Sequence, residues 1–156
     1  MPDIPLPEDL STYMRTMESR IRALETAPRA QDTSLPWNYS FIDVLEITSS
    51  TTYTDLGTLG PTITLTVGQS GRVFLTVGAY IDVPAGAQGT VGLFIDASYV
   101  RDVVTLGGVS NTITNPSTTR IITGLSEGSH TFALKYRSAT GVALTFGARF
   151  LTIQPF

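Results

Sequence analysis

The chain has 156 residues and a formal net charge of -3, with no cysteine and one histidine, His130. This composition excludes disulfides, thiol nucleophiles and His-rich metal sites, and the scattered basic residues give no footprint for nucleic acid. The length suits one core-bearing domain with a small appendage, and we expect no metal or cofactor.

The N-terminus, MPDIP, lacks the basic region and apolar run of a signal peptide. No apolar stretch is long enough to span a bilayer. We therefore expect a protein that is made in the cytosol and does not insert into a membrane.

Residues 1–9 form a proline-rich leader. Pro2, Pro5 and Pro7 each fix φ and remove a backbone donor, which predicts an extended peptide. We interpret this leader as an anchor that attaches the chain to a larger assembly. The alternative is a frayed chain terminus.

Residues 10–27 are predicted to form a helix that stops at Pro28. Its apolar residues recur at alternating steps of three and four, as in the seam of a coiled coil. The heptad places Leu10, Met17 and Leu24 at d, Met14 and Ile21 at a, Arg20 at g and Glu25 at the following e.

The charged residues beside this seam indicate how many helices associate in the coiled coil. Arg20 at g and Glu25 at e are positioned to pair between helices, and with apolar a and d they resemble the short trimerisation motif of three-stranded coiled coils. Ile at a with Leu at d favours a dimer instead. We favour a homotrimer, and the alternative is a helix packed on its own domain.

Residues 28–36, bracketed by two prolines, are predicted to be a linker, and from Trp37 onward the apolar period changes from 3.6 to 2. Eight or nine short strands are predicted, at 41–48, 62–67, 72–82, 90–96, 99–105, 118–123, 130–137, 142–146 and 149–154. Short strands with turn residues between them favour a mainly β head over 37–156, an antiparallel jelly-roll sandwich.

Aromatic residues mark possible contact surfaces of this head. Phe74 and Tyr80 lie on the strand face opposite the one that carries Val73 and Ile81. This second face is unusually apolar for a solvated surface, which indicates an intersubunit contact. Phe94 gives its own strand the same character.

Further aromatic residues have two interpretations each. Trp37 and Tyr39 either close the base of the head where it meets the stem or stack on sugars of a host surface. Tyr53, Tyr80 and Tyr99 are interpreted first as interface or core residues and second as a ligand platform.

No catalytic residue is expected. His130 begins a predicted strand and is interpreted as a surface or hairpin residue, with no Ser or Thr matched to it for a triad. The aspartates Asp43, Asp55, Asp82, Asp96 and Asp102 are spread over separate segments, with no Asp-x-Asp pattern for calcium and no recognisable glycosidase pair.

Two segments carry a resemblance to a known family. GSHTFALKYR at 128–137, followed by a Gly turn and RFLTIQP at 149–155, resembles the C-terminal hairpin of trimeric heads in bacteriophage fibres. Those heads are similar to the jelly rolls of complement C1q and tumour necrosis factor. The opening, from LPEDL at 6–10 through Arg20 to 28–29, is similar to the N-termini of short tail and head-fibre proteins in phages of actinobacteria.

The resemblance implies a virion structural protein that assembles in the host cytoplasm. It would be a homotrimer whose stem attaches to other virion proteins through the leader and helix, while the head faces outward. The expected role is a tail-associated fibre or minor tail protein that contacts the host surface, including its glycans. The alternatives are a capsid decoration protein or head fibre at three-fold positions, and a carbohydrate-binding module.

Overall fold

The computed structural model describes residues 8–26 and 37–156. The chain divides into two compact units, Met1–Ser34 and Leu35–Phe156, which are described separately. The predicted leader at 1–7 and the predicted linker at 28–36 lie outside the described residues.

The described part of the first unit is the helix α1, Glu8–Thr26. It begins two residues before the predicted start and ends one residue before the predicted end. Glu8 and Asp9 stand in its first turn, where negative charge is favourable at the positive end of the helix dipole.

The second unit, called the head below, contains ten strands among residues 37–156. They are β1 (Asn38–Ile42), β2 (Glu46–Thr48), β3 (Thr62–Val67), β4 (Val73–Val83), β5 (Gln88–Ile95), β6 (Ser98–Gly107), β7 (Thr112–Thr114), β8 (Ser117–Ile122), β9 (Gly128–Ser138) and β10 (Leu144–Pro155). Alternating Thr and aliphatic residues, as in β3, suit a pleated strand with one buried face.

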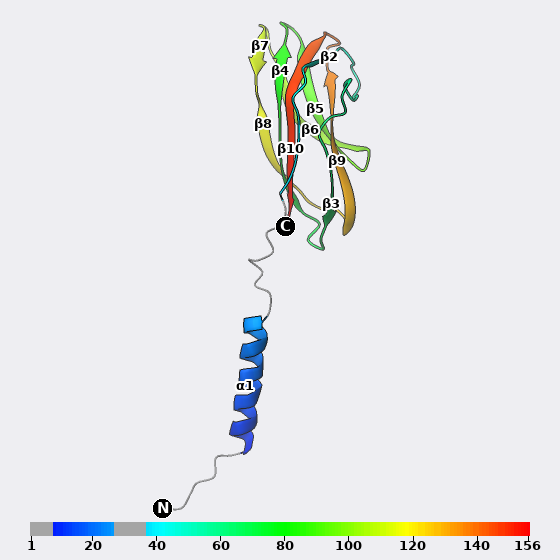
Figure 1. The fold of residues 1–156 in the computed structure, drawn as a ribbon. Coiled ribbons are helices and arrows are strands. Elements are labelled where there is room, and N and C mark those ends of the chain that lie inside the picture. The colour runs from blue at the N-terminus through cyan, green and yellow to red at the C-terminus, as the bar shows by residue number, and fades with distance from the viewer. Residues whose placement is uncertain (1–7, 27–36) are drawn as a thin grey trace, which may run out of the picture. The chain divides into compact units, whose positions relative to one another are not determined.

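These strands form two antiparallel sheets, and in Figure 1 β4, β7, β8 and β10 of one sheet lie on the left of the head and β3 and β9 of the other lie on the right. The six-stranded sheet has the order β1-β10-β4-β7, with β2 also paired to β10 and β8 to β4. The four-stranded sheet has the order β3-β9-β5-β6. The prediction of a mainly β, antiparallel sandwich is confirmed.

The pairing within the sheets is nested along the chain. The first strand, β1, pairs with the last, β10, and β3 pairs with β9. Further inward, β4 pairs with β8 and β5 pairs with β6. The chain thus folds back on itself as one long ribbon that alternates between the two sheets.

The core lies between the sheets. The residues predicted to face inward on β4, among them Val73, Leu75 and Ile81, are fully buried. From the opposite sheet, Phe132, Leu134 and Tyr136 of β9 are buried against them. The two inner faces therefore supply an apolar layer as sequence alternation predicts.

Three predicted strands differ from those observed. The stretch at 41–48 is interrupted, because β1 ends at Ile42 and β2 begins at Glu46. The stretches at 142–146 and 149–154 form one strand, β10, with a register shift between Gly147 and Phe150 where Ala148 has φ of 41°. A β-bulge lets one strand continue through the gap between the two predicted segments. The short strand β7 lies in a segment predicted to be a loop.

The predicted C-terminal hairpin is wrong. β9 pairs with β3 and β5, whereas β10 pairs with β1, β2 and β4, so the two strands lie in different sheets. The turn at 138–141 carries the chain from one sheet to the other, because each strand buries its apolar face against the opposite sheet.

Candidate functional site

The seam of α1 is exposed in the single chain. Leu10, Met14, Met17 and Ile21 are 42–57 % exposed, and Arg20 is exposed beside them. Leu24 and Glu25 fall within α1, but their side chains lie outside the described residues. The structure thus places the predicted seam residues on a helix with their apolar side chains uncovered.

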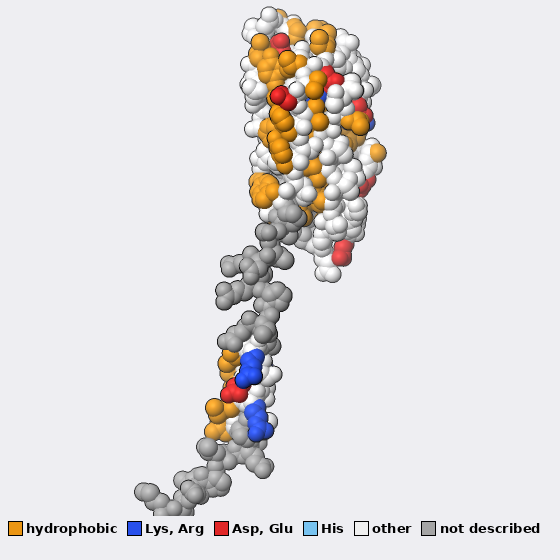
Figure 2. Space-filling model, viewed as in Figure 1, with side chains coloured by type: hydrophobic (Ala, Val, Ile, Leu, Met, Phe, Trp, Pro, Cys, Tyr) orange, Lys and Arg blue, Asp and Glu red, His pale blue; other side chains and the backbone are white. Residues whose placement is uncertain are grey.

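A second apolar surface covers the outside of the six-stranded sheet. We call it the aromatic face, and it consists of Trp37, Tyr39, Phe41, Ile47, Phe74, Tyr80, Ile113, Ile121 and Phe150. Strand register brings these side chains together, since Phe41 is opposite Phe150 and Phe74 is opposite Ile121. Figure 2 shows hydrophobic side chains running down the head over β4 and β10.

The rings on this face contact one another. Tyr39 and Phe41 stack with 6.2 Å between ring centroids, and Trp37 meets Phe74 edge to face at 6.3 Å. Trp37 and Tyr39, the two predicted contact residues, are both more than half exposed. The sequence prediction that Phe74 and Tyr80 face away from the core is confirmed.

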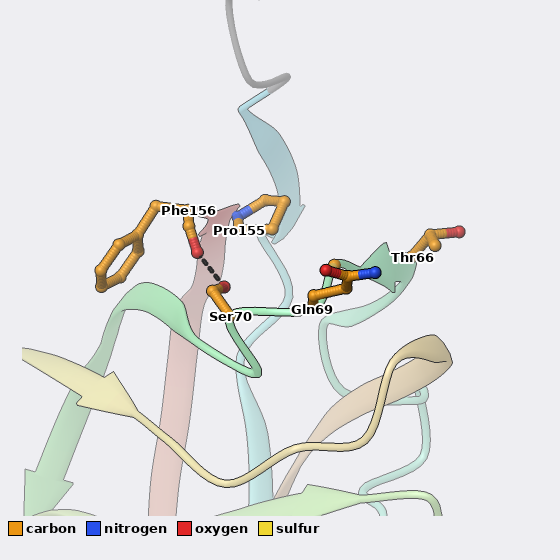
Figure 3. A pocket seen from close by; sticks show the side chains of 6 residues that line it. Thr66, Gln69, Ser70, Pro155 and Phe156 are labelled. Atoms are coloured by element: carbon orange, nitrogen blue, oxygen red, sulfur yellow. Dashed lines mark hydrogen bonds between the residues drawn. The ribbon is translucent and has the colours of Figure 1, made fainter.

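A hollow of about 430 Å³ lies at one end of the head, beside the turn after β3 (Figure 3). It is lined by Thr66, Gly68, Gln69, Ser70, Pro155 and Phe156. The Ser70 hydroxyl donates to the Phe156 carbonyl across its floor. None of these six side chains is ionisable.

A polar and aromatic group lies on the outer side of the four-stranded sheet. We call it the Asp102 cluster, and it consists of Tyr53, Phe94, Tyr99, Asp102 and Arg137. Asp102 Oδ1 accepts hydrogen bonds from the Tyr53 hydroxyl and, at 2.7 Å, from the Tyr99 hydroxyl. Arg137 Nη2 donates to Asp102 Oδ2 at 3.4 Å.

The rings of the Asp102 cluster contact one another and the Arg137 guanidinium. The Arg137 guanidinium lies 4.7 Å from the centroid of Tyr53, and Tyr53 stacks on Tyr99 at 5.3 Å. Phe94 meets both tyrosines edge to face at 5.6 Å. Such offset and edge contacts stabilise an aromatic cluster beyond simple area burial.

Hydrogen bonding also fixes the charge states in this cluster. Burial acts to raise the pKa of Asp102, but hydrogen bonds from the two tyrosines and Arg137 outweigh it and hold the pKa below 3.8. The pKa of Tyr53 is raised by burial and by its bond to Asp102. The carboxylate is therefore ionised and both phenols are neutral at pH 7.

His130 is buried at 8 % exposure, so the prediction of a surface position is wrong. The fold brings Asp96 to its Nδ1 at 2.7 Å and Ser126 to its Nε2, neighbours that spacing along the chain did not reveal. Nε2 lies 2.9 Å from the Ser126 carbonyl, which only accepts hydrogen bonds. In the imidazolium form both ring nitrogens donate, to the Asp96 carboxylate and to the Ser126 carbonyl, and this form has no lone pair with which to activate the Ser126 hydroxyl.

Two further features are absent from the part of the chain that the structure describes. Residues 8–26 and 37–156 contain no group of three or more His, Cys, Asp or Glu that could hold a metal ion. Within the same residues, no helix has the length and apolar character needed to cross a membrane.

No protein-family model and no curated protein matches this chain. Solved structures similar to it include the dimeric latent PorU of Porphyromonas gingivalis, with 11 % identity, a TM-score of 0.37 and coverage of 74 % of this chain and 13 % of PorU. A family 35 carbohydrate-binding module from an environmental isolate has 14 % identity, a TM-score of 0.36 and coverage of 80 % and 94 %. The C-terminal domain of EclA, a sugar-binding protein, has 14 % identity, a TM-score of 0.36 and coverage of 83 % and 84 %. At this level of similarity, these structures carry no statement about what the chain binds.

Sequence reasoning named Tyr53 and Tyr99, together with Tyr80, as interface or core residues first and a ligand platform second, and it named Phe94 separately. It did not predict the cluster that Tyr53, Phe94 and Tyr99 form with Asp102 and Arg137. Tyr53 lies 49 positions before Asp102, in an irregular segment between β2 and β3. The available signal was Gly92, the strand residue over which the Tyr53 ring lies. A glycine inside a strand often marks a place where another group approaches closely.

Proposed function

We propose that this protein is a homotrimeric structural protein of a virion, in which α1 forms a three-stranded stem and the head faces outward. The observation that carries the proposal is the exposed seam of α1. Four described apolar side chains, Leu10, Met14, Met17 and Ile21, share one side of the helix and are 42–57 % exposed.

The length of α1 supports a partner for this seam. Most helical stability in proteins comes from packing an amphipathic face rather than from propensity, so α1, with 19 residues, is expected to need a partner for its seam. Further copies of the same helix present the matching a and d side chains. The seam is thereby covered without any other protein.

The aromatic face supports the proposal that the partner is a further copy of this chain. Contiguous apolar surface of this kind is rare on monomers, and Tyr, Trp and Phe are enriched in the cores of interfaces. The face begins at Trp37, eleven residues after Thr26, so the chain between them can span at most about 40 Å. Helices joined in a stem would thus tether the heads of one trimer to one another and raise their effective concentration.

The nested strand pairing supports a jelly roll, the fold implied by the resemblance to phage fibre heads. The order β1-β10-β4-β8 in one sheet and β3-β9-β5-β6 in the other pairs the first strand with the last and proceeds inward. The proposed role is a tail-associated fibre or minor tail protein that is assembled in the host cytoplasm. A decoration protein or head fibre on the capsid remains the alternative.

Charge placed on the seam tests this proposal. In Met14→Glu/Ile21→Glu, six carboxylates would meet in the core of a trimer, so sedimentation should show a monomer with an unchanged head. The matched control is Thr12→Glu/Ser19→Glu, which adds the same charge at outward f positions and should leave the trimer intact. Equal masses for the two variants would contradict the proposed stem.

The copy number per particle separates the two virion locations. A tail protein is present in a handful of copies and a decoration protein in hundreds. Densitometry of purified particles, calibrated against a capsid protein of known copy number, distinguishes them.

A further inference from the structure

We propose that the Asp102 cluster is a saccharide-binding site that takes a neutral pyranose. The inference deepens the proposed outward-facing role of the head, but it depends on the geometry of a single chain and not on the oligomeric state. The site lies on β5, β6 and β9 with Tyr53 packed against them, and neither of the two predicted contact residues, Trp37 and Tyr39, belongs to it.

The cluster presents an aromatic surface held in place from behind. Tyr53 lies over Gly92, and a Cβ at that position would fall 2.6 Å from Tyr53 Cε1. Tyr53 in turn supports Tyr99, whose ring stacks on it and remains 51 % exposed. The Tyr99 ring is thus both fixed and open, as required to receive the C–H face of a sugar ring.

Polar groups border the same surface. The Asp102 and Arg137 side chains are 37 % and 33 % exposed, so an acceptor and a donor are both accessible beside Tyr99. The carboxylate is already oriented by the two tyrosine hydroxyls. Hydroxyl groups of a pyranose both donate and accept, so they can bond to this pair without displacing it.

The charge balance selects for a neutral ligand. Asp102 is paired with Arg137, and next to them Lys135 Nζ is 3.0 Å from Asp55 Oδ2. The Lys135 ammonium also lies 5.5 Å from the centroid of Phe94, and Arg137 covers Tyr53, so two ring faces already hold cations. No surplus charge remains among these four side chains to attract a phosphate or a quaternary amine.

The position of the cluster keeps it accessible in the proposed assembly. The aromatic face is the outer side of the six-stranded sheet, while the Asp102 cluster is on the outer side of the four-stranded sheet. The two surfaces lie on opposite sides of the sandwich. Association through the aromatic face therefore leaves the cluster facing solvent.

The test uses the full chain and a panel of immobilised neutral oligosaccharides of glucose, galactose, mannose, rhamnose and N-acetylglucosamine. We expect retention of the unmodified protein on at least one member at millimolar affinity. Tyr99→Ala should weaken that binding at least about tenfold, because it removes the central contact of the site. Asp102→Asn should weaken it as well, and Gly92→Ala should do so by displacing Tyr53.

Val109→Ala is the control, because Val109 is 98 % exposed and belongs to neither the aromatic face nor the Asp102 cluster, and this variant should bind as the unmodified protein does. Circular dichroism and the oligomeric state of every variant show that the head is folded. No retention on any member, retention on acidic saccharides alone, or binding that Tyr39→Ala on the aromatic face removes and Tyr99→Ala spares would overturn the inference.

The oligomeric state measured on the same samples separates this inference from the proposed function. A monomer that binds sugar through Tyr99 contradicts the trimer and supports the site. A trimer that binds no saccharide supports the trimer and contradicts the site.

Discussion

Arg149 and Glu46 form an ion pair inside the sandwich, with 2.6 Å between Arg149 Nη2 and Glu46 Oε2. The Arg149 side chain is fully buried and that of Glu46 is 15 % exposed. Glu46 Oε1 also accepts from the Thr58 backbone N–H at 2.5 Å, and Arg149 Nη1 donates to the Thr58 carbonyl at 3.4 Å. The pair therefore ties β2, β10 and the irregular segment after β2 together.

Removing the negative partner of this pair should destabilise the head strongly. In Glu46→Gln the buried guanidinium loses its counter-charge, which we expect to lower the free energy of unfolding by about 3–5 kcal/mol. Urea unfolding followed by tryptophan fluorescence measures the change. The same substitution at exposed Glu127 should change it by less than about 0.5 kcal/mol. Equal changes in the free energy of unfolding at the two positions would show that the buried ion pair does not stabilise the head.

The His130–Asp96 pair should make stability depend on pH. Hydrogen bonds to Asp96 and to the Ser126 backbone raise the pKa of His130 above 6.5, so its contribution is full below 6.5 and is lost as pH rises through the folded-state pKa. Bonds from the Thr131 N–H and from His130 lower the pKa of Asp96 below 3.8, so its contribution is lost as pH falls through that lower value. The pair thus contributes most between the two.

The check is the unfolding free energy of the unmodified chain and of His130→Asn at about pH 5.5 and about pH 8.5. The difference between the two proteins should be larger at the lower pH. A difference that grows with pH would contradict the assigned imidazolium.

Gly60 should not tolerate a side chain. A Cβ there would lie 2.3 Å from the Leu134 carbonyl oxygen and 3.1 Å from the Tyr136 ring, so the backbone of β9 would have to move. We expect Gly60→Ala to cost about 1–3 kcal/mol of stability. Gly68→Ala, where the new Cβ has no neighbour within 4 Å, is the control and should be neutral or slightly stabilising. Thermal unfolding of both variants decides between these outcomes.

A charge on the aromatic face should weaken association. Phe41 on the edge strand β1 lies opposite Phe150 of β10, so Phe41→Lys would bury an ammonium between subunits that associate through this face. We expect the association constant of the full chain to fall at least about tenfold. Thr66→Lys on exposed β3 is the control and should leave association unchanged. If sedimentation shows the same association for both variants, the aromatic face does not lie between subunits.

The sequence was sufficient to predict the strands whose two faces differ in polarity. In β3 and β4 the alternation of apolar residues along the sequence matches the alternation of buried residues in the structure, because each strand buries one side. Arg149 shares the inward alternation of Leu151 and Ile153, yet the predicted strands stop at 146 and begin again at 149. The bulge at Ala148 keeps the strand continuous and the guanidinium buried.

The neighbours of His130 and Asp102 could not be predicted in the same way. Asp96 reaches His130 from a turn 34 positions earlier in the chain, and Tyr53 reaches Asp102 from a segment without periodicity. Such contacts depend on how the sheets stack, which local patterns do not encode. The same limit explains the mistaken hairpin, since β9 and β10 each look like half of one but belong to different sheets.

The molar mass of the unmodified full chain in solution, by light scattering across a range of concentrations, tests the central claim most directly. The proposed stem and aromatic face predict three times the chain mass of 16.7 kDa. A mass of 16.7 kDa at every concentration would contradict the trimer and leave both apolar surfaces to other partners.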